Sequence, residues 1–312
     1  MNLEDIKTVG VVGAGTMGHG IALSFVLWGY PTLLMDVKRE ILERARARIG
    51  EVLCSFVEGQ LITRKQADDA LGRLTTTLDL AAMARGADYI CEAIIERSEE
   101  KKQLFNKLDA MCPPHTILTS NTSALLLSDF ASEVKRQNKI LVTHYFNPPH
   151  IVPCVEVVKG PGTSDETFNL VYDLLGKVRK LPVRVLRELP GYLVNRIQFA
   201  MYREACDLWA QGVASAEDID RAVKGSFGFR LASIGPLLNM DLCGDPQMGV
   251  VAIDMFNGVF SQISNAKKIP RKLSDLWQAN KGFYDYPPEK WAKITKQRDK
   301  EFLSRLRELY WS

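Results

Sequence analysis

The stretch that decides the fold is VGVVGAGTMG, residues 9–18. Four residues typical of a buried strand lead into a GxGxxG pattern, and a helical stretch begins around Met17. Gly13 allows a tight turn, Gly15 lets backbone N–H groups approach a pyrophosphate, and Gly18 lets the helix pack closely on the strand. Because a helix N-terminus also carries partial positive charge, the predicted phosphate-binding residues are Gly13, Gly15, Thr16, Met17 and Gly18.

Asp36 follows the next β-rich segment, at the spacing expected of a carboxylate that accepts hydrogen bonds from adenosine ribose hydroxyls. This carboxylate would repel the 2′-phosphate of NADP, so the pattern favours NAD. One alternative is a structural glycine turn beside a solvated Asp, and another is a flavin-binding domain, although flavoproteins usually need a far longer chain. The combination of strand, turn, helix and Asp favours NAD over both.

Short β-rich segments alternate with amphipathic helical stretches as far as about Val185, which predicts an α/β Rossmann-type doubly wound sheet. A long helical segment, residues 39–73, interrupts this alternation, and Gly59 divides it into a predicted helical hairpin insertion. The predicted strands are residues 8–12, 32–35, 89–93, 117–120, 140–144 and 155–158.

The pattern becomes helical after Pro190-Gly191, so we expect two domains. Residues 1–188 would form the NAD-binding domain, and residues 189–312 an all-α C-terminal domain for substrate binding and dimerisation. Two domains also suit 312 residues, since domains usually contain roughly 100 to 200. The predicted helices of the second domain begin near Val194 and cover residues 216–223, 246–263 and 289–310, with a turn at 280–286.

The composition, with 46% hydrophobic and 25% charged residues, is that of a globular enzyme. A net charge of +3 without a dense basic stripe argues against a nucleic-acid partner. No run of about 18 apolar residues occurs, so we expect no membrane partner. The six cysteines lack paired spacing and predict reduced thiols and a cytoplasmic location, and the four histidines lack zinc-site spacing, so no metal is expected.

Polar residues gather at the predicted strand ends further along the chain. Asn121 and Ser123 follow one strand, His144 ends another, and Glu156 lies within the next. Ligands of such sheets bind at the carboxyl ends of the strands. An imidazole can remove the hydroxyl proton of an alcohol as hydride leaves, and a carboxylate on its other nitrogen fixes the tautomer. His144 is the candidate base, although a lone His at a strand end is more often structural; His150 is the rival.

Several segments together resemble the L-3-hydroxyacyl-CoA dehydrogenase family over nearly the whole chain, although none alone would be specific. They are GAGTMGHGIA (13–22), EAIIERSEEKKQLF (92–105), SNTSALLLSD (120–129), HYFNPPHIVPCVEVV (144–158), PGYLVNRI (190–197) and KGFYDY (281–286). The resemblance implies NAD-dependent hydride transfer at carbon 3 of an L-3-hydroxyacyl-CoA or a related 3-hydroxy acid. It also implies a role in fatty acid metabolism and a homodimer formed through the C-terminal domain.

By the same resemblance, His144 is the catalytic base and Glu156 is its partner. Ser123 and Asn195 would hold the substrate oxygen, since each can donate a hydrogen bond as charge develops. Turn and helix-start chemistry is the ordinary alternative for these two residues. The resemblance also implies that the residues around the nicotinamide half of the cofactor are Glu96, Lys101 and Asn121.

The chain departs from the family pattern at two places that bear on the substrate. Family members that use coenzyme A carry lysines in the hairpin, whereas residues 50–63 here contain no Lys or Arg. Arg230, in the segment GFRLASIGP, is similar to an arginine of relatives that oxidise free hydroxy acids, such as gulonate (lambda-crystallin) and carnitine dehydrogenases. The NPPHIVP segment also resembles a dehydrogenase of a pyridoxine-degradation intermediate. Arg230 therefore predicts a carboxylate-binding substrate residue, with a surface ion pair as the alternative.

Two other protein classes share this domain order. The 6-phosphogluconate and 3-hydroxyisobutyrate dehydrogenase group uses a catalytic lysine near the interdomain helix, where this chain has Asn195-Arg196. Lambda-crystallin exemplifies a catalytically idle NAD-binding protein of this kind. An abundant structural protein needs no catalytic residues. An enzyme is therefore favoured by the presence together of Ser123, His144, Glu156 and Asn195.

Overall fold

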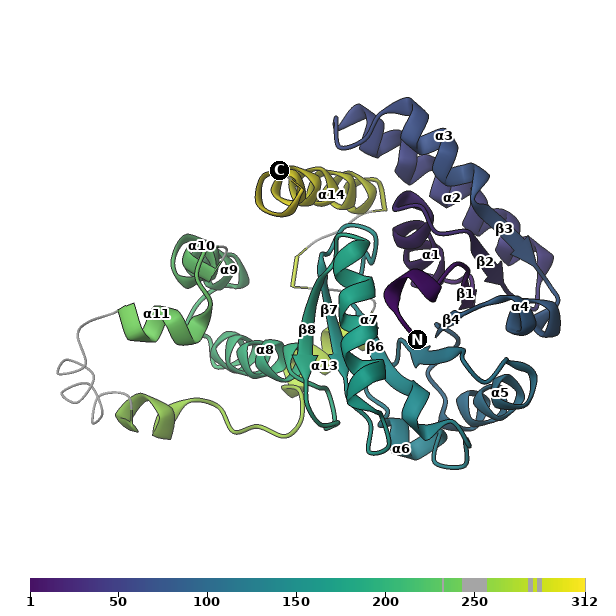
Figure 1. Cartoon of the computed structure of the whole chain (residues 1–312). Coiled ribbons are helices and arrows are strands. Elements are labelled where there is room, and N and C mark those ends of the chain that lie inside the picture. The colour runs from purple at the N-terminus through teal and green to yellow at the C-terminus, as the bar shows by residue number, and fades with distance from the viewer. Residues whose placement is uncertain (232, 243–256, 280–282, 285–287, 312) are drawn as a thin grey trace. The chain divides into compact units, whose positions relative to one another are not determined.

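The computed structural model of the chain describes residues 1–231, 233–242, 257–279, 283–284 and 288–311. Its centre is an eight-stranded sheet with the order β3-β2-β1-β4-β5-β6-β7-β8 (Figure 1). Neighbouring strands are parallel, except that β7 runs antiparallel to β6. This topology confirms the doubly wound α/β sheet. The strands are β1 (Val9–Val12), β2 (Thr32–Met35), β3 (Leu74–Thr77), β4 (Tyr89–Glu92), β5 (Ile117–Ser120), β6 (Ile140–Tyr145), β7 (Cys154–Val158) and β8 (Leu181–Val185).

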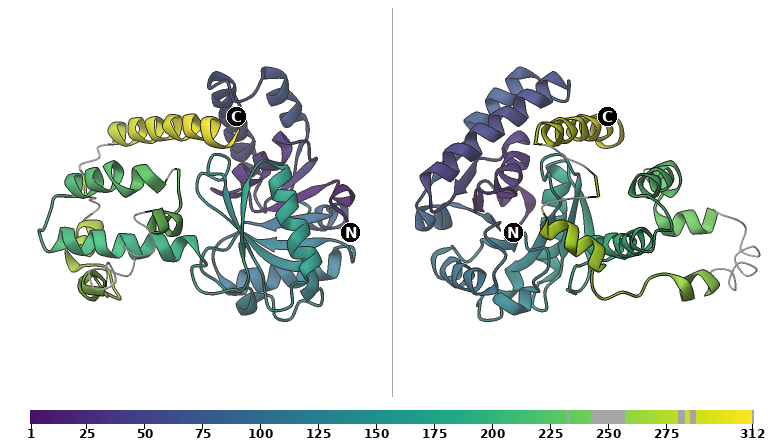
Figure 2. Two further views of the ribbon diagram at one scale, coloured as in Figure 1. Left: turned by 60° about the vertical axis from the view of Figure 1, so that its left-hand side comes forward. Right: turned by 180° about the vertical axis from the view of Figure 1, so that it is seen from behind.

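Helices cover both faces of this sheet, so alternate residues of a strand enter two separate cores (Figure 2). Val9 and Val11 of β1 pack with residues of α1, α2 and α7, whereas Val12 packs with residues of α4, α5 and α6. Burial on both faces explains why the central strands consist mostly of apolar residues. The helices are η1 (Leu3–Asp5), α1 (Gly18–Leu27), α2 (Arg39–Glu58), α3 (Arg64–Gly72), α4 (Leu80–Gly86), α5 (Ser98–Met111), α6 (Leu127–Phe130), η2 (Gln137–Lys139) and α7 (Asp165–Lys177).

The helical hairpin expected at residues 39–73 is present as α2 and α3. Its first helix ends at Glu58 with Gly59 as the C-cap, which confirms the predicted break. Thr63 begins the second helix: its side chain accepts from Gln66 N, and the Gln66 side chain accepts from Thr63 N. This capping box satisfies two otherwise unpaired N–H groups.

The six predicted strands correspond to β1, β2, β4, β5, β6 and β7, each within a residue at either end. The prediction missed β3 and β8, which are the two edge strands. β3 is mostly threonine and β8 contains Pro182 and Arg184, so neither has the apolar run of a central strand. The apolar pattern of the sequence predicts a strand less well at the edge of a sheet, where fewer neighbouring elements cover the strand.

The chain divides into two compact units. The first contains Met1–Asn195 and Ile294–Ser312, and the second contains Arg196–Lys293. The regular elements described in the second unit are all helical, as expected. They are α8 (Val194–Ala210), which begins in the first unit, α9 (Ala216–Gly225), α10 (Phe227–Leu231), α11 (Pro236–Leu242), α13 (Arg271–Gln278) and the start of α14 (Pro288–Tyr310).

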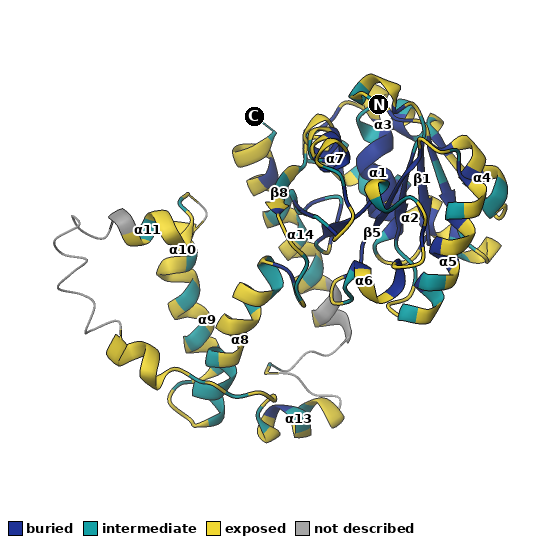
Figure 3. Cartoon of the chain, turned by 60° about the horizontal axis from the view of Figure 1, so that its bottom comes forward, coloured by how far each residue is buried: buried dark blue, intermediate teal, exposed yellow. Residues whose placement is uncertain are grey.

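The two units differ sharply in burial (Figure 3). Nearly all of the buried apolar side chains belong to the first unit, whereas Leu273 is the one described residue of the second unit in the buried core. The expected helix at 246–263 falls mostly outside the described residues. Most of the expected turn at 280–286 and Cys243 also lie outside them.

The C-terminal end of α14 packs within the first unit, next to α1 and α2 (Figure 2). Leu306 is 3% exposed, and the Trp311 ring makes edge contacts with Trp28 and Phe56 at centroid distances of 5.4 and 5.7 Å. We expected residues 189–312 to form one domain. The first compact unit instead extends to Asn195 and also contains Ile294–Ser312. Helical periodicity identifies an apolar face but does not tell which partner covers it.

Candidate active site

Most of the predicted site residues lie at the carboxyl edge of the sheet. The glycine turn follows β1, Asp36 follows β2, Asn121 follows β5, and His144 is the penultimate residue of β6. β1 pairs with both β2 and β4, so the chain winds away from β1 in both directions and β1 marks the topological switch point. Such switch points leave a crevice in which open α/β sheets bind ligands.

The glycine turn has the backbone geometry that the sequence predicts. Gly13 has a φ of 95°, and a Cβ there would lie 2.5 Å from Ala93 O. A Cβ on Gly18 would lie 1.7 Å from Gly13 O, so these two positions require glycine for packing. A Cβ on Gly15 would meet no atom within 4 Å, and Gly15 and Thr16 are exposed. The space beside Gly15 is therefore open to a ligand.

Asp36 is bonded to the same turn. Its Oδ2 accepts from Ala14 N at 2.9 Å, and its Oδ1 accepts from Lys38 N at 3.3 Å. The carboxylate thus lies beside the glycine turn, where the ribose hydroxyls of a dinucleotide would be expected. The glycine turn, the open space and the carboxylate together fit NAD.

His144 and Glu156 form a buried pair. They are directly opposite each other in the antiparallel β6–β7 ladder, and their side chains are 4% and 0% exposed. His144 Nδ1 lies 2.8 Å from Glu156 Oε2. Because an ionised carboxylate can only accept, Nδ1 carries the proton and Nε2 is left as an acceptor. The pair therefore holds the imidazole in the tautomer that a base requires.

The second oxygen of Glu156 binds the start of α8. Glu156 Oε1 accepts from Leu193 N at 2.9 Å and from Val194 N at 2.7 Å. These N–H groups belong to the helix N-terminus, which favours negative charge. One carboxylate consequently links the imidazole to the helix that carries Asn195.

Ser123 and Asn195 are neighbours. Asn195 Nδ2 donates to Ser123 O over 3.4 Å, and Asn195 is the second residue of α8. Since Glu156 binds the start of the same helix, the four residues predicted as catalytic are connected by hydrogen bonds in one region of the first unit.

The three residues predicted around the nicotinamide half have definite partners. Asn121 Oδ1 accepts from Tyr145 N at 2.8 Å, which joins the end of β5 to the end of β6. Lys101 is 1% exposed, and its Nζ lies 2.6 Å from Glu92 Oε1 and 3.2 Å from Glu96 Oε2. Lys101 is thus part of a carboxylate network, and Glu96 is its more exposed member.

Residues 8–189 match the NAD binding domain of 3-hydroxyacyl-CoA dehydrogenase, and residues 191–286 match the C-terminal domain of the same enzyme family. The chain belongs to the 3-hydroxyacyl-CoA dehydrogenase family. Family membership makes it an oxidoreductase with NAD as its cofactor, which confirms the cofactor predicted from the glycine turn and Asp36.

Named relatives differ in the substrates that their names give. The chain is 37% identical over 258 residues to 3-hydroxyadipyl-CoA dehydrogenase of Escherichia coli, covering 83% of this chain and 53% of that protein. It is 33% identical to 3-hydroxybutyryl-CoA dehydrogenase of Clostridioides difficile, covering 88% of this chain and 98% of the relative. A crystal structure of 5-formyl-3-hydroxy-2-methylpyridine 4-carboxylic acid 5-dehydrogenase, an NAD⁺-dependent dismutase, matches with a TM-score of 0.86 and 27% identity, covering 97% and 98% of the two chains.

His150, the rival base, lies in a different environment from His144. Its Nδ1 is buried and has no partner among the described residues, and its ring lies 5.9 Å from that of His19. Burial, followed by the nearby His19 and Lys180 charges, lowers the pKa of His150 to about 3. The geometry therefore favours His144, which has its own carboxylate, as the base of this dehydrogenase.

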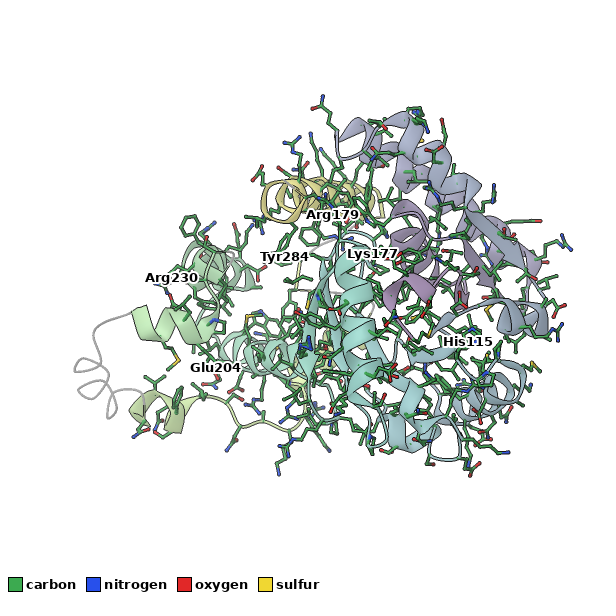
Figure 4. The ribbon with its side chains drawn as sticks, viewed as in Figure 1. His115, Lys177, Arg179, Glu204, Arg230 and Tyr284 are labelled. Carbon is green, nitrogen blue, oxygen red and sulfur yellow. The ribbon has the colours of Figure 1, made fainter. Side chains whose placement is uncertain are left out.

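Arg230 lies on α10 in the second unit (Figure 4). The residue is exposed, and its guanidinium forms no ion pair with any described residue. No helix in the described ranges is long and apolar enough to cross a membrane, and no metal-binding group of His, Cys, Asp or Glu occurs in them.

Three side chains of the site were missed by sequence reasoning. Tyr192 is buried with a φ of 46°, its ring lies 5.7 Å from the His144 ring, and its Oη donates to Leu125 O at 2.7 Å. The Phe146 ring makes an edge contact with His144 at 4.5 Å, and Glu92 is fully buried beside Lys101. The available signal was the position of Tyr192 within the family segment PGYLVNRI, from which no role for this residue was predicted.

Proposed function

We propose that this chain oxidises a secondary alcohol, at carbon 3 of an acyl or related hydroxy-acid substrate, to the ketone. The observation that carries the proposal is the buried His144–Glu156 pair, which presents an imidazole Nε2 as a proton acceptor. NAD, when bound, supplies the hydride acceptor. His144 removes the hydroxyl proton, Glu156 stabilises the resulting imidazolium, and in the reverse direction the imidazolium returns the proton.

The same proposal assigns roles to the neighbouring polar groups. Ser123 Oγ and Asn195 Nδ2 donate to the substrate oxygen as negative charge develops on it. Asn121, Glu96 and Lys101 surround the nicotinamide half of the cofactor, with Lys101 acting through Glu96 because its own ammonium is enclosed. The dinucleotide backbone lies on Gly13, Gly15, Thr16, Met17 and Gly18, and Asp36 accepts from the adenosine ribose.

The group through which the enzyme binds its substrate is coenzyme A in the first candidate. In the second candidate it is a free carboxylate. Arg230 is exposed and makes no ion pair with the described residues, so its guanidinium is available to grip a carboxylate in two places. The hairpin residues 50–63 carry no cation for coenzyme A phosphates. The structural match to a pyridine carboxylic acid dehydrogenase also supports this candidate.

The test measures NADH formation by purified protein with 3-hydroxybutyryl-CoA, free 3-hydroxybutyrate, carnitine and gulonate. We expect turnover of at least one alcohol and a loss of about 10²–10⁴-fold in kcat for His144→Ala. His115→Ala is the matched control, because His115 is half-exposed and pairs with Asp88. Equal turnover by wild type and His144→Ala would remove the assignment of the base. Absence of NADH formation with all four alcohols would leave the catalytically idle crystallin-like alternative.

The variant Arg230→Ala distinguishes a free-acid substrate from a coenzyme A thioester. If the substrate is a free acid, this variant loses a bidentate contact between the Arg230 guanidinium and the substrate carboxylate. The KM for the free acid should then rise by about 10-fold or more. Strong turnover of the thioester with no effect of Arg230→Ala would overturn the carboxylate candidate and place the enzyme in acyl-CoA chemistry and fatty acid metabolism.

The proposal includes a homodimer formed through the second unit and a cytoplasmic location. The second unit exposes large apolar side chains, including Phe229 and Leu237 at 77% each, which a second copy would cover. The five described cysteines are free, which fits a reducing compartment. A small-molecule substrate, with neither nucleic acid nor membrane, completes the expected set of partners.

A further inference from the structure

The turn that carries Ser123 is tied to a single carboxylate oxygen. Glu96 Oε1 accepts from Thr122 Oγ1 at 2.5 Å, from Ser123 N at 2.9 Å and from Ala124 N at 3.2 Å. Glu96 lies between β4 and α5, whereas residues 122–124 follow β5, so these bonds join two separate segments. Three donors converging on one oxygen fix the backbone of the turn more firmly than a single bond would.

Glu96 is itself held from the interior of the first unit. Its Oε2 lies 3.2 Å from Lys101 Nζ, and Lys101 also pairs with Glu92 at 2.6 Å. Glu92 is 0% exposed and accepts from Ser120 Oγ at 2.6 Å and from Ile94 N at 2.7 Å. The network therefore connects the ends of β4 and β5 to α5, and Glu96 is its outer member.

The electrostatics keep Glu96 in the form that makes these bonds. Burial alone would raise the pKa of Glu96, but the hydrogen bond from Thr122, the Lys101 charge and the bond from Ser123 N together lower it. The carboxylate is consequently ionised at neutral pH and acts only as an acceptor.

Ser123 is exposed, and its backbone is held on both sides. Glu96 binds its N–H, and Asn195 Nδ2 donates to its C=O. The following residues are also fixed, because Leu125 N donates to Thr122 Oγ1 and Tyr192 Oη donates to Leu125 O. The Ser123 hydroxyl therefore projects from a rigid turn, as a preorganised donor to a developing oxyanion requires.

We infer that Glu96 is a positioning residue that acts on the reaction through Ser123, in addition to any contact with the cofactor. The inference rests on the proposed function, because it needs Ser123 Oγ to bind the substrate oxygen. It assigns Lys101 and Glu92 to the same task, since they fix Glu96. The distinguishing consequence is that Glu96 matters to kcat only while Ser123 has its hydroxyl.

The experiment is a double-mutant cycle of Glu96→Ala and Ser123→Ala in the full-length enzyme. kcat is measured at saturating NAD with whichever of the four alcohols gives the highest rate, and NAD affinity is titrated separately. We expect each single variant to lower kcat by about 10- to 100-fold, and the double variant to match Ser123→Ala within about 3-fold. Glu96→Gln, which keeps one acceptor oxygen for the turn, should retain more activity than Glu96→Ala.

Glu99→Gln is the matched control, because Glu99 lies on α5 and is exposed, with its carboxylate bonded to Gln103. If Glu96→Ala does not fold, Glu96→Gln takes its place in the same cycle. Full additivity of the two kcat effects would overturn the inference, and so would a change confined to NAD affinity or an unchanged kcat for Ser123→Ala. Failure of the proposed function is distinct: NAD turnover would then be absent or insensitive to His144→Ala.

Discussion

At the residue scale, Glu156 uses both of its oxygens as acceptors, one for His144 Nδ1 and the other for two backbone N–H groups of α8. A glutamine in its place has one acceptor oxygen and one donor nitrogen. Whichever way the amide points, its NH₂ group faces a donor. Position 156 therefore requires a charged carboxylate for geometric reasons as well as electrostatic ones.

We predict that Glu156→Gln lowers kcat by about 10²–10⁴-fold, because the imidazole loses the acceptor that fixes its tautomer. The free energy of unfolding should also fall by about 1–3 kcal/mol, since a buried donor is left without an acceptor. Steady-state NADH formation and urea unfolding measure the two effects. Glu133→Gln, at an exposed carboxylate paired with Lys102, is the control. A kcat within 2-fold of wild type would contradict the assigned role.

The glycines of the turn should separate cofactor binding from folding. Gly15→Ala places a methyl group in open space, so we predict a stability change within about 0.5 kcal/mol and NAD binding weakened by about 10-fold or more. Gly18→Ala meets Gly13 O and should destabilise the fold. Calorimetric titration with NAD and thermal unfolding give the comparison. Unchanged NAD affinity in Gly15→Ala would mean that the pyrophosphate lies elsewhere.

The sequence was informative about those residues whose chemistry is specific to a task. The glycine turn and Asp36 predicted NAD. The pairing of His144 with Glu156 came from the family resemblance, and the β6–β7 ladder places the two residues opposite each other. Tyr192 and Glu92 could not be predicted, since their importance depends on side-chain contacts formed between distant segments.

At the element scale, the strength of the sequence signal follows burial. Central strands, apolar on both faces, were predicted to within a residue at either end, and the hairpin was predicted from its helical spacing and from Gly59. The edge strands β3 and β8 were not, because exposure on one side relaxes their composition. The partner of α14 was also not predictable, since an apolar helix face is compatible with either unit.

We predict that the C-terminal end of α14 stabilises the NAD-binding unit. Trp311→Ala removes edge contacts with Trp28 and Phe56 and should lower the free energy of unfolding by about 2 kcal/mol. Leu309→Ala, at a half-exposed position in the last turn of α14 and two residues before Trp311, should have a much smaller effect. Urea unfolding followed by fluorescence measures both variants. Equal stability of the Trp311 and Leu309 variants would show that this contact is dispensable.

At the scale of the whole molecule, the described part of the second unit buries few of its side chains. Leu273 is the one described residue of that unit in the buried core, whereas α8, α10 and α11 expose large apolar side chains. Isolated helices of this length depend on packing for their stability. A second copy of the chain supplies that packing in the proposed homodimer.

We predict a dimer in solution, with twice the chain mass by sedimentation velocity at micromolar concentration. Phe229→Asp should raise the dissociation constant by about 100-fold, because a charge would enter a desolvated contact. Leu186→Asp, at a position of the first unit that is 73% exposed, should leave the dimer intact. A wild-type protein that sediments as a monomer over this range would contradict the prediction.

The most direct test of the central claim is a crystal structure of the protein with NAD and a reactive alcohol bound. We predict that His144 Nε2 lies about 3 Å from the alcohol oxygen and that the reacting carbon lies about 3–3.5 Å from C4 of the nicotinamide ring. If the ring and the imidazole instead lay too far apart for one small molecule to touch both, His144 would not be the base and the account would be wrong.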